Sequence, residues 1–199
     1  MKKVLVLVAA VVLVSAVQAQ KGSIKFGVKA GANFYKFSGD DADFGDVSPK
    51  IQVGIAGGGL VNIPVSDMFS VQPEILFSME GAKYEESGDK LMYKTNYINI
   101  PVLFQYNNAS GFYAETGPQI GFLMSAKADD GSNSTDVKDS FKGTNFSWAL
   151  GLGYKTKSGF GFGARYNLGL GNIIDETDVD IKLGGFHVGV FYLFGGEKK

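Results

Sequence analysis

A period-two pattern that recurs eight times after residue 23 constrains the fold of this chain more than any other feature. In each copy of about ten residues, apolar side chains alternate with glycine or polar ones, as where Phe186, Val188 and Val190 alternate with His187 and Gly189. Successive side chains of a strand point to opposite faces, so the pattern predicts amphipathic β-strands. The expected strands span residues 24–37, 51–63, 68–84, 94–106, 111–123, 144–154, 160–170 and 182–194.

The first nineteen residues have the pattern of a secretory signal peptide. Lys2 and Lys3 precede an apolar run over 4–14, and Val17 and Ala19 are the small residues that a signal peptidase requires. The run is shorter than the ~20 residues that cross a bilayer as a helix. We therefore expect a signal peptide at 1–19 and a single domain at 20–199. Because the sequence contains no cysteine, a lipid-modified N-terminus and disulfides are excluded.

The connections between the expected strands alternate in length. Four are long and carry most of the acidic residues, and three are short; they span 38–50, 85–93, 124–143 and 171–181 against 64–67, 107–110 and 155–159. Short periplasmic turns and longer extracellular loops are typical of outer-membrane barrels. The pattern therefore predicts an all-β fold: an eight-stranded antiparallel up-and-down transmembrane β-barrel, a monomer in the outer membrane of a Gram-negative bacterium, with both termini periplasmic.

A soluble ligand-binding barrel, such as a lipocalin, is the alternative architecture. It would bury the apolar face of each strand inside, but the Gly-x-Trp signature expected near its start is missing. The near-neutral net charge of −1 argues against a nucleic-acid partner.

Two rings are predicted on the apolar face. Aromatic residues gather at the short-turn ends, as expected at a membrane interface: Phe26, Phe69, Tyr106, Phe112, Tyr154, Phe160, Tyr192 and Phe194. Lysines fall at the loop-side ends: Lys36, Lys83, Lys94, Lys142 and Lys182. Long lysine stems can place the ammonium group at the interface. We hypothesise that this rim contacts the phosphates of lipopolysaccharide; solvated strand ends are the alternative.

The polar face predicts a lumenal charge network. An eight-stranded barrel is only wide enough for side chains to fill it, and unpaired buried charges are costly. We expect Lys29 and Arg165 to pair with Glu74 and Glu115. The predicted result is a lumen plugged by polar side chains; a gated narrow conduit is the alternative.

The sequence contains no pattern that predicts catalysis, a metal or a cofactor. His187 is the only histidine, and its phase places it in the lumen, away from the lipid-facing position that a membrane acylhydrolase requires. The acidic loop residues do not match an EF-hand. Three consecutive glycines, Gly57 to Gly59, lie within an expected strand, where they indicate close backbone packing or curvature.

Four segments of this chain resemble the PorT-like outer-membrane β-barrel family. They are Phe26–Asn33, Tyr97–Leu103, Gly117-Pro118 and Arg165–Leu170. The likeness covers 24–194 and implies an outer-membrane location, with one branch of the family serving protein secretion. One departure is Asn99, where the family often has an acidic residue that would pair with Arg165. A second is the tail 195–199 after Phe194.

The expected function is that of a small, non-enzymatic outer-membrane protein with a structural or interaction role. Its extracellular loops would form the contact surface for an envelope protein partner, and outer-membrane lipid and lipopolysaccharide would surround it. A narrow porin-like channel and a secretion-system accessory barrel are the alternatives.

Overall fold

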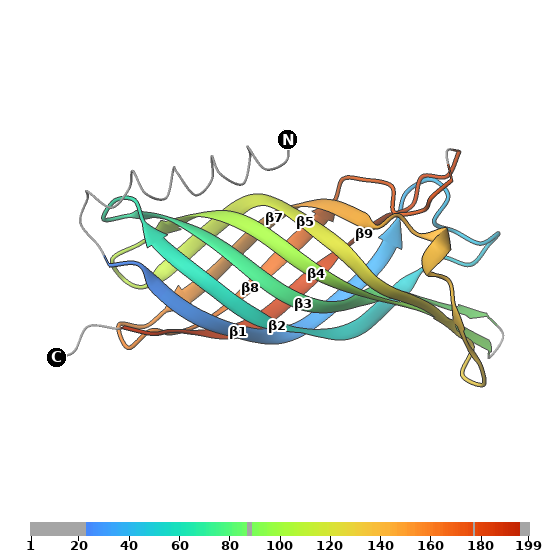
Figure 1. Cartoon of the computed structure of the whole chain (residues 1–199), viewed down its shortest axis with the longest axis horizontal. Helices are drawn as coiled ribbons and strands as arrows, with labels where there is room; N and C mark the ends of the chain where they lie inside the picture. Colours follow the sequence, from blue (N-terminus) through green and yellow to red (C-terminus); the bar gives the residue numbers. More distant parts are fainter. Residues whose placement is uncertain (1–22, 87–88, 177, 196–199) are drawn as a thin grey trace.

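The protein is a closed ring of eight antiparallel strands (Figure 1). The computed structural model describes residues 23–86, 89–176 and 178–195, so the expected signal peptide lies outside the described residues. The ring consists of β1 (Lys25–Ser38), β2 (Lys50–Pro64), β3 (Phe69–Glu86), β4 (Asp89–Asn107), β5 (Phe112–Asp129), β7 (Thr144–Lys155), β8 (Phe160–Gly169) and β9 (Lys182–Leu193). Pairing of β1 with β9 closes the sheet. The predicted fold class is confirmed.

The strands β3, β4 and β5 are longer than the sequence pattern predicts, and the prediction of a long loop at 85–93 is wrong. Pairing of β3 with β4 continues to Glu86 and Asp89, and β5 pairs with β4 as far as Asp129. The short strand β6 (Ser134–Asp136) adds to β5, and the 3-10 turn η2 (Lys138–Ser140) follows it. These strands project beyond the ring on the loop side (Figure 1). Polar residues in the projecting part hid its period-two pattern.

The outward face carries the apolar side chains of every strand, as the alternation predicts. Trp148 points outward and donates a 2.8 Å hydrogen bond from Nε1 to Oγ1 of Thr116, whereas Arg165 is buried inside. Aromatic rings of neighbouring strands meet at the short-turn end, with centroids 5.5 Å apart for Phe69 and Tyr106. Phe112 and Tyr154 on β5 and β7 are 5.1 Å apart at the same level. These contacts across strands lie where the aromatic ring is predicted.

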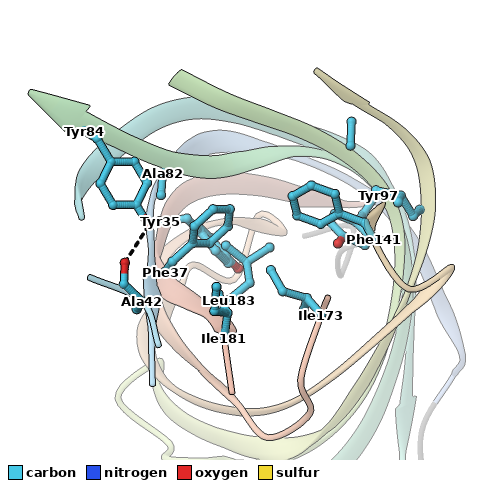
Figure 2. Packing of buried hydrophobic residues seen from close by; sticks show 12 residues of the cluster. Tyr35, Phe37, Ala42, Ala82, Tyr84, Tyr97, Phe141, Ile173, Ile181 and Leu183 are labelled. Carbon is cyan, nitrogen blue, oxygen red and sulfur yellow. Dashed lines mark hydrogen bonds between the residues drawn. The ribbon is translucent and has the colours of Figure 1, made fainter. Parts of the chain in front are cut away.

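The inside of the barrel is layered, which corrects the prediction of a purely polar plug. Figure 2 shows an apolar cluster inside the loop-side mouth, to which strands and connecting segments both contribute. Phe37 and Leu183 come from strands, whereas Phe141, Ile173 and Ile181 come from the connections. A smaller apolar cluster of Leu60, Tyr113, Phe191 and Leu193 lies at the turn side. Polar residues fill the layer between the two clusters, and Asn62, Ser70 and Gln105 extend the polar packing to the turn-side end.

The connecting segments are hydrogen-bonded to one another above this mouth. The backbone N–H of Lys142 donates to the carbonyl of Ile173 at 2.7 Å, and that of Asp175 donates to Ser140 at 3.0 Å. The Asp180 N–H donates to a carboxylate oxygen of Asp41 at 2.7 Å. Tyr84 extends its hydroxyl to the carbonyl of Ala42. The loops therefore form one connected cap that places its apolar side chains inside the barrel.

The glycine run 57–59 on β2 provides a test of the close backbone packing between β2 and β3. A Cβ at Gly58 would lie 2.0 Å from the carbonyl oxygen of Ile75, whereas the nearest atom to a Cβ at Gly59 would be 3.9 Å away. We predict that Gly58→Ala separates β2 from β3 and destabilises the barrel by about 1–3 kcal/mol. Gly59→Ala, the matched control, should leave stability near the wild-type value. Heat-modifiable gel migration measures both, and equal midpoints would contradict the prediction.

Candidate functional site in the lumen and at the loop-side rim

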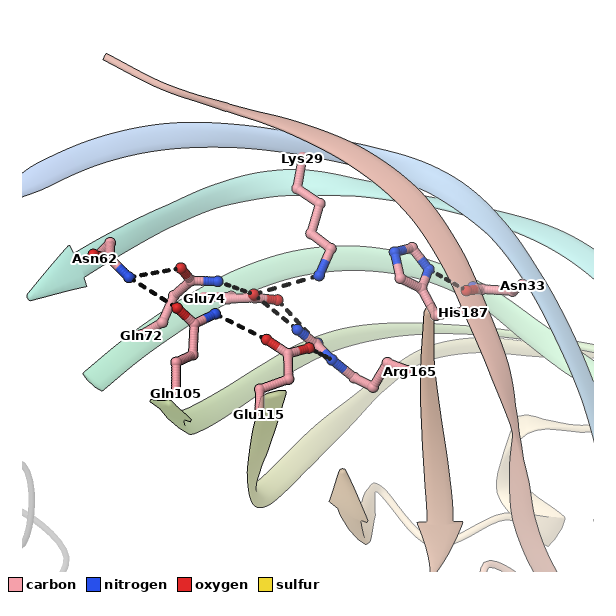
Figure 3. A network of polar contacts seen from close by, with 9 residues as sticks. All are labelled: Lys29, Asn33, Asn62, Gln72, Glu74, Gln105, Glu115, Arg165 and His187. Carbon is pink, nitrogen blue, oxygen red and sulfur yellow. Dashed lines mark hydrogen bonds and ion pairs between the residues drawn. The ribbon is translucent and has the colours of Figure 1, made fainter. Parts of the chain in front are cut away.

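The four charged residues predicted for the lumen meet in its middle layer (Figure 3). Arg165 donates from both terminal nitrogens to the Glu74 carboxylate at 2.9 and 3.0 Å. Its Nε donates to Glu115 at 2.8 Å. Lys29 Nζ lies 3.5 Å from Glu74 Oε1, the oxygen that also accepts from Nη2 of Arg165. The structure therefore brings all four side chains together from β1, β3, β5 and β8.

The network is buried and its charges balance. Side chains of Glu74, Glu115 and Arg165 are at most 3% exposed. Two cations face two carboxylates, and the bidentate Arg165–Glu74 pair has the geometry that guanidinium and carboxylate groups prefer. Mutual neutralisation offsets the cost of removing each charge from water.

Amide side chains complete the hydrogen bonding of the carboxylates toward the turn side. Gln72 Nε2 donates to Glu74 at 2.8 Å, and Gln105 Nε2 donates to Glu115 at 2.9 Å. Asn62 in turn donates to the carbonyl oxygens of both glutamines, at 3.1 and 3.0 Å. Figure 3 shows that these amides form a continuous chain leading away from the charges. The network is therefore held from several strands at once, so rotation of a single side chain does not open it.

His187 lies in the lumen, as its phase predicts. Its Nδ1 is 2.9 Å from Oδ1 of Asn33, and the residue is 4% exposed. Within the described part of the chain, no hydrogen bond joins its ring to a serine or a carboxylate. Asn99, where the family resemblance favours an acid, donates instead to Glu80 at 2.6 Å. Arg165 thus takes its acidic partners from β3 and β5.

The rim lysines lie at the loop side but differ in their surroundings. Lys36 is exposed on β1. Lys83 pairs with Glu85 at 2.9 Å, Lys94 with Asp129 at 2.7 Å, and Lys182 with Asp180 at 2.9 Å. The sequence pattern did not predict these ion pairs, because Glu85 and Asp129 belong to the strand extensions that the pattern missed.

The fifth rim lysine, Lys142, precedes β7 and lines a loop-side pocket. The pocket has a volume of about 620 Å³ and includes Asp40, Asp175, Glu176 and Asp178 in its lining. No group of three or more acidic or histidine side chains among the described residues has a metal-binding arrangement. Lys142 therefore shares its pocket with acidic residues, and its surroundings differ from the ring of unpaired lysines that the rim hypothesis pictured.

Ion pairs on the projecting hairpin shift two carboxyl groups. Hydrogen bonds from Lys83 and Lys50 lower the pKa of Glu85 to about 2. The pKa of Asp129 is lowered by the Lys94 ammonium and by the backbone N–H of Gly131. Both carboxylates stay ionised across the physiological range, so these pairs persist there; exposed pairs of this kind contribute little to stability.

Fold and lumen together define a small transmembrane β-barrel with a packed, charge-balanced interior. The sequence profile of the family described as "Outer membrane protein beta-barrel domain" matches residues 18–175, and the chain belongs to this family. It is accordingly a protein of the Gram-negative outer membrane. The match ends before β9, the strand that closes the ring in the structure.

Several solved structures of outer-membrane barrels are similar to this chain, and the first of them shares its fold. Neisserial surface protein A (NspA) is 14% identical over 86% of this chain and 99% of its own, with a TM-score of 0.56. Ail of Yersinia pestis is 15% identical over 87% and 100%, with a TM-score of 0.49. OprG of Pseudomonas aeruginosa is 12% identical over 85% and 95%, with a TM-score of 0.43. No curated protein matches the sequence.

The charge network provides the second test. Arg165→Ala would leave two carboxylates buried without their main cation, and we predict a loss of about 3–5 kcal/mol in stability. The exposed Lys157→Ala should change stability little and serves as the control. The double variant Arg165→Met/Glu115→Gln removes one cation and one carboxylate, leaves Lys29 opposite Glu74, and should recover much of the loss. Unfolding monitored by heat-modifiable migration distinguishes these cases, and a stable Arg165→Ala protein would refute the assigned role.

Proposed function

We propose that this protein is a structural or interaction protein of the outer membrane that uses its loop cap as the contact surface, with a closed lumen. The observation that carries the proposal is the apolar cluster inside the loop-side mouth. Phe141, Ile173 and Ile181 come from the connections yet are buried within the barrel. A conduit requires a continuous water path, whereas here the same residues close the mouth and fix the loops above it.

The proposal assigns the loop cap to the outside of the cell and both chain ends to the periplasm. In known outer-membrane barrels the short turns face the periplasm and the longer loops face outward. The described chain begins and ends at the short-turn end of the barrel (Figure 1). The longer connections, which carry the cap, all leave from the opposite end.

The partner class that fits the cap is an envelope protein with a basic surface. Acidic residues of two connections, among them Asp40, Asp41, Asp178 and Asp180, line one pocket of the cap. Complementary charge steers such encounters and selects partners. The hydrogen bonds between the connections hold this acidic surface in one conformation, which lowers the entropic cost of binding.

The PorT-like branch is the finer family assignment that we propose. It is supported by the Ile100-Pro101 and Arg165-Tyr166 elements. In each pair one residue, Pro101 or Arg165, faces the lumen and its neighbour faces outward. With this assignment, a role as an accessory barrel in protein secretion becomes the second candidate. We propose a non-enzymatic protein in either case, and a monomeric one.

Conductance separates the closed barrel from a narrow conduit. The refolded mature protein should give no single-channel steps in planar lipid bilayers, because an apolar cluster fills the loop-side mouth and the charge network fills the middle of the lumen. The polar middle layer is the feature that favours the conduit. Discrete, reproducible steps from the wild-type protein would support the conduit and overturn the closed-lumen proposal.

We also propose that the lysine rim contacts lipopolysaccharide phosphates. Because Lys83, Lys94 and Lys182 already pair with acids, each would bind phosphate in competition with its partner, and the exposed Lys36 should contribute most. We predict that replacing all five rim lysines with glutamine reduces lipopolysaccharide co-purification severalfold. Replacing Lys155 and Lys157, at the opposite end, provides the control. Unchanged co-purification of the rim variant would refute the contact.

A further inference from the structure

Glu80 is a buried carboxylate that takes no part in the charge network. It lies on β3 and is 3% exposed. Its Oε1 accepts hydrogen bonds from Ser78 Oγ at 2.7 Å and Asn99 Nδ2 at 2.6 Å, while Oε2 has no partner. The lumenal ion pairs go to Glu74 and Glu115 instead. An isolated buried carboxylate is costly, so its charge requires compensation.

The unpartnered Oε2 atom is one of several in the same part of the lumen. The other side-chain atoms of the strand walls that are buried and without a hydrogen-bond partner are Thr95 Oγ1, Tyr97 OH, Asn99 Oδ1, Asn145 Oδ1, Ser147 Oγ, Asn167 Oδ1 and His187 Nε2. Buried polar atoms in folded proteins nearly always have a partner. Their concentration in one region marks that region of the lumen as a candidate site for a bound ligand or water.

Strand register joins these atoms into one compartment. Asn99 on β4 is opposite Gly121 on β5, which is opposite Asn145 on β7. A Cβ at Gly121 would lie 2.5 Å from Asn99 Oδ1 and 3.7 Å from the Asn145 Cβ, so the glycine allows the Asn99 amide to lie against β5 beside Asn145. On the other side, Asn33 bridges Ser78, at 2.8 Å, and His187, at 2.9 Å.

The compartment is rich in acceptors. Carboxylate and amide oxygens can only accept hydrogen bonds. Asn33 uses its amide N–H groups on Ser78 Oγ and on the carbonyl of Met79. Its Oδ1 must therefore accept from the protonated Nδ1 of His187, which leaves Nε2 of the neutral ring as a further acceptor. An anion does not fit such a lining, whereas a cation does.

The compartment is also closed. Tyr97 and Leu123 belong to the apolar cluster that fills the mouth above it. The layer below contains the charge network, in which Lys29 and Arg165 are already balanced by two carboxylates. Glu80 supplies a single negative charge, which matches one positive charge. Hard alkali cations take oxygen ligands of this kind, with water completing the coordination.

We propose that the loop-side half of the lumen is a binding site for a monovalent cation, Na⁺ or K⁺, held by Glu80 Oε2 and the neighbouring amide and hydroxyl oxygens. The ion is the counter-charge of Glu80, and its waters satisfy the acceptors that it does not reach. It stabilises the half of the barrel that anchors the loop cap. This site goes beyond the contact role proposed above and does not depend on it.

The wild-type protein provides the first test. Crystals of the refolded barrel soaked in Tl⁺, a scatterer that replaces K⁺, should show one anomalous peak in the lumen beside Glu80. In solution, the midpoint of thermal unfolding should rise by about 3–5 °C for each tenfold increase in Na⁺ or K⁺ above the Kd. N-methyl-D-glucamine chloride at equal ionic strength should give no such rise, because the ion is too large to enter.

Variants localise the effect. Glu80→Gln should abolish the anomalous peak and the cation dependence, while Glu85→Gln, which removes a partly exposed carboxylate from the same strand, should retain both. If Glu80→Gln does not fold, the two wild-type experiments still decide the question. Absence of a lumenal peak together with equal midpoints in Na⁺ and N-methyl-D-glucamine would overturn the proposal and leave Glu80 protonated among waters.

Discussion

Closure of the sheet by the pairing of β1 with β9 is the constraint on which the rest of this structure depends. Inside a bilayer every backbone N–H and C=O must find its partner within the protein, and a closed barrel achieves this without an edge strand. With eight strands the ring encloses only enough space for side chains. Every residue that the alternation points inward must therefore pack, pair or hold a ligand.

The layering of the lumen follows from that restriction. In the middle layer, charges come from four strands and neutralise one another, and amides relay the hydrogen bonds toward the turn side. At the loop side, the connecting segments insert apolar side chains into the mouth, which buries them and fixes the cap. The proposed contact surface and the proposed closed lumen would thus be two consequences of one packing arrangement. A substitution in the buried cluster should therefore alter the conformation of the loops, and a change in the loops should alter the packing of the cluster.

Much of this could be read from the sequence, because a period of two is a local property of a strand. The phase of each strand predicted that Trp148 points outward and Arg165 inward, and the narrowness of an eight-stranded lumen required Arg165 and Lys29 to have acidic partners. The projecting β3–β4 hairpin was missed because its alternation involves polar residues such as Lys90 and Glu85. The burial of Ile173 and Ile181 was missed because connecting segments carry no periodicity that indicates where they fold.

The sequence by itself determined the strand number, the inward or outward direction of the side chains in the predicted strands and the membrane in which the barrel resides. Only the tertiary structure decided which inward residues meet, since that depends on the stagger between strands distant along the chain. Glu74, Glu80 and Glu115 look equivalent in the alternating pattern. The register places Glu74 and Glu115 against Arg165 and leaves Glu80 among amides and hydroxyls, and this difference in neighbours gives the three carboxylates different physical roles.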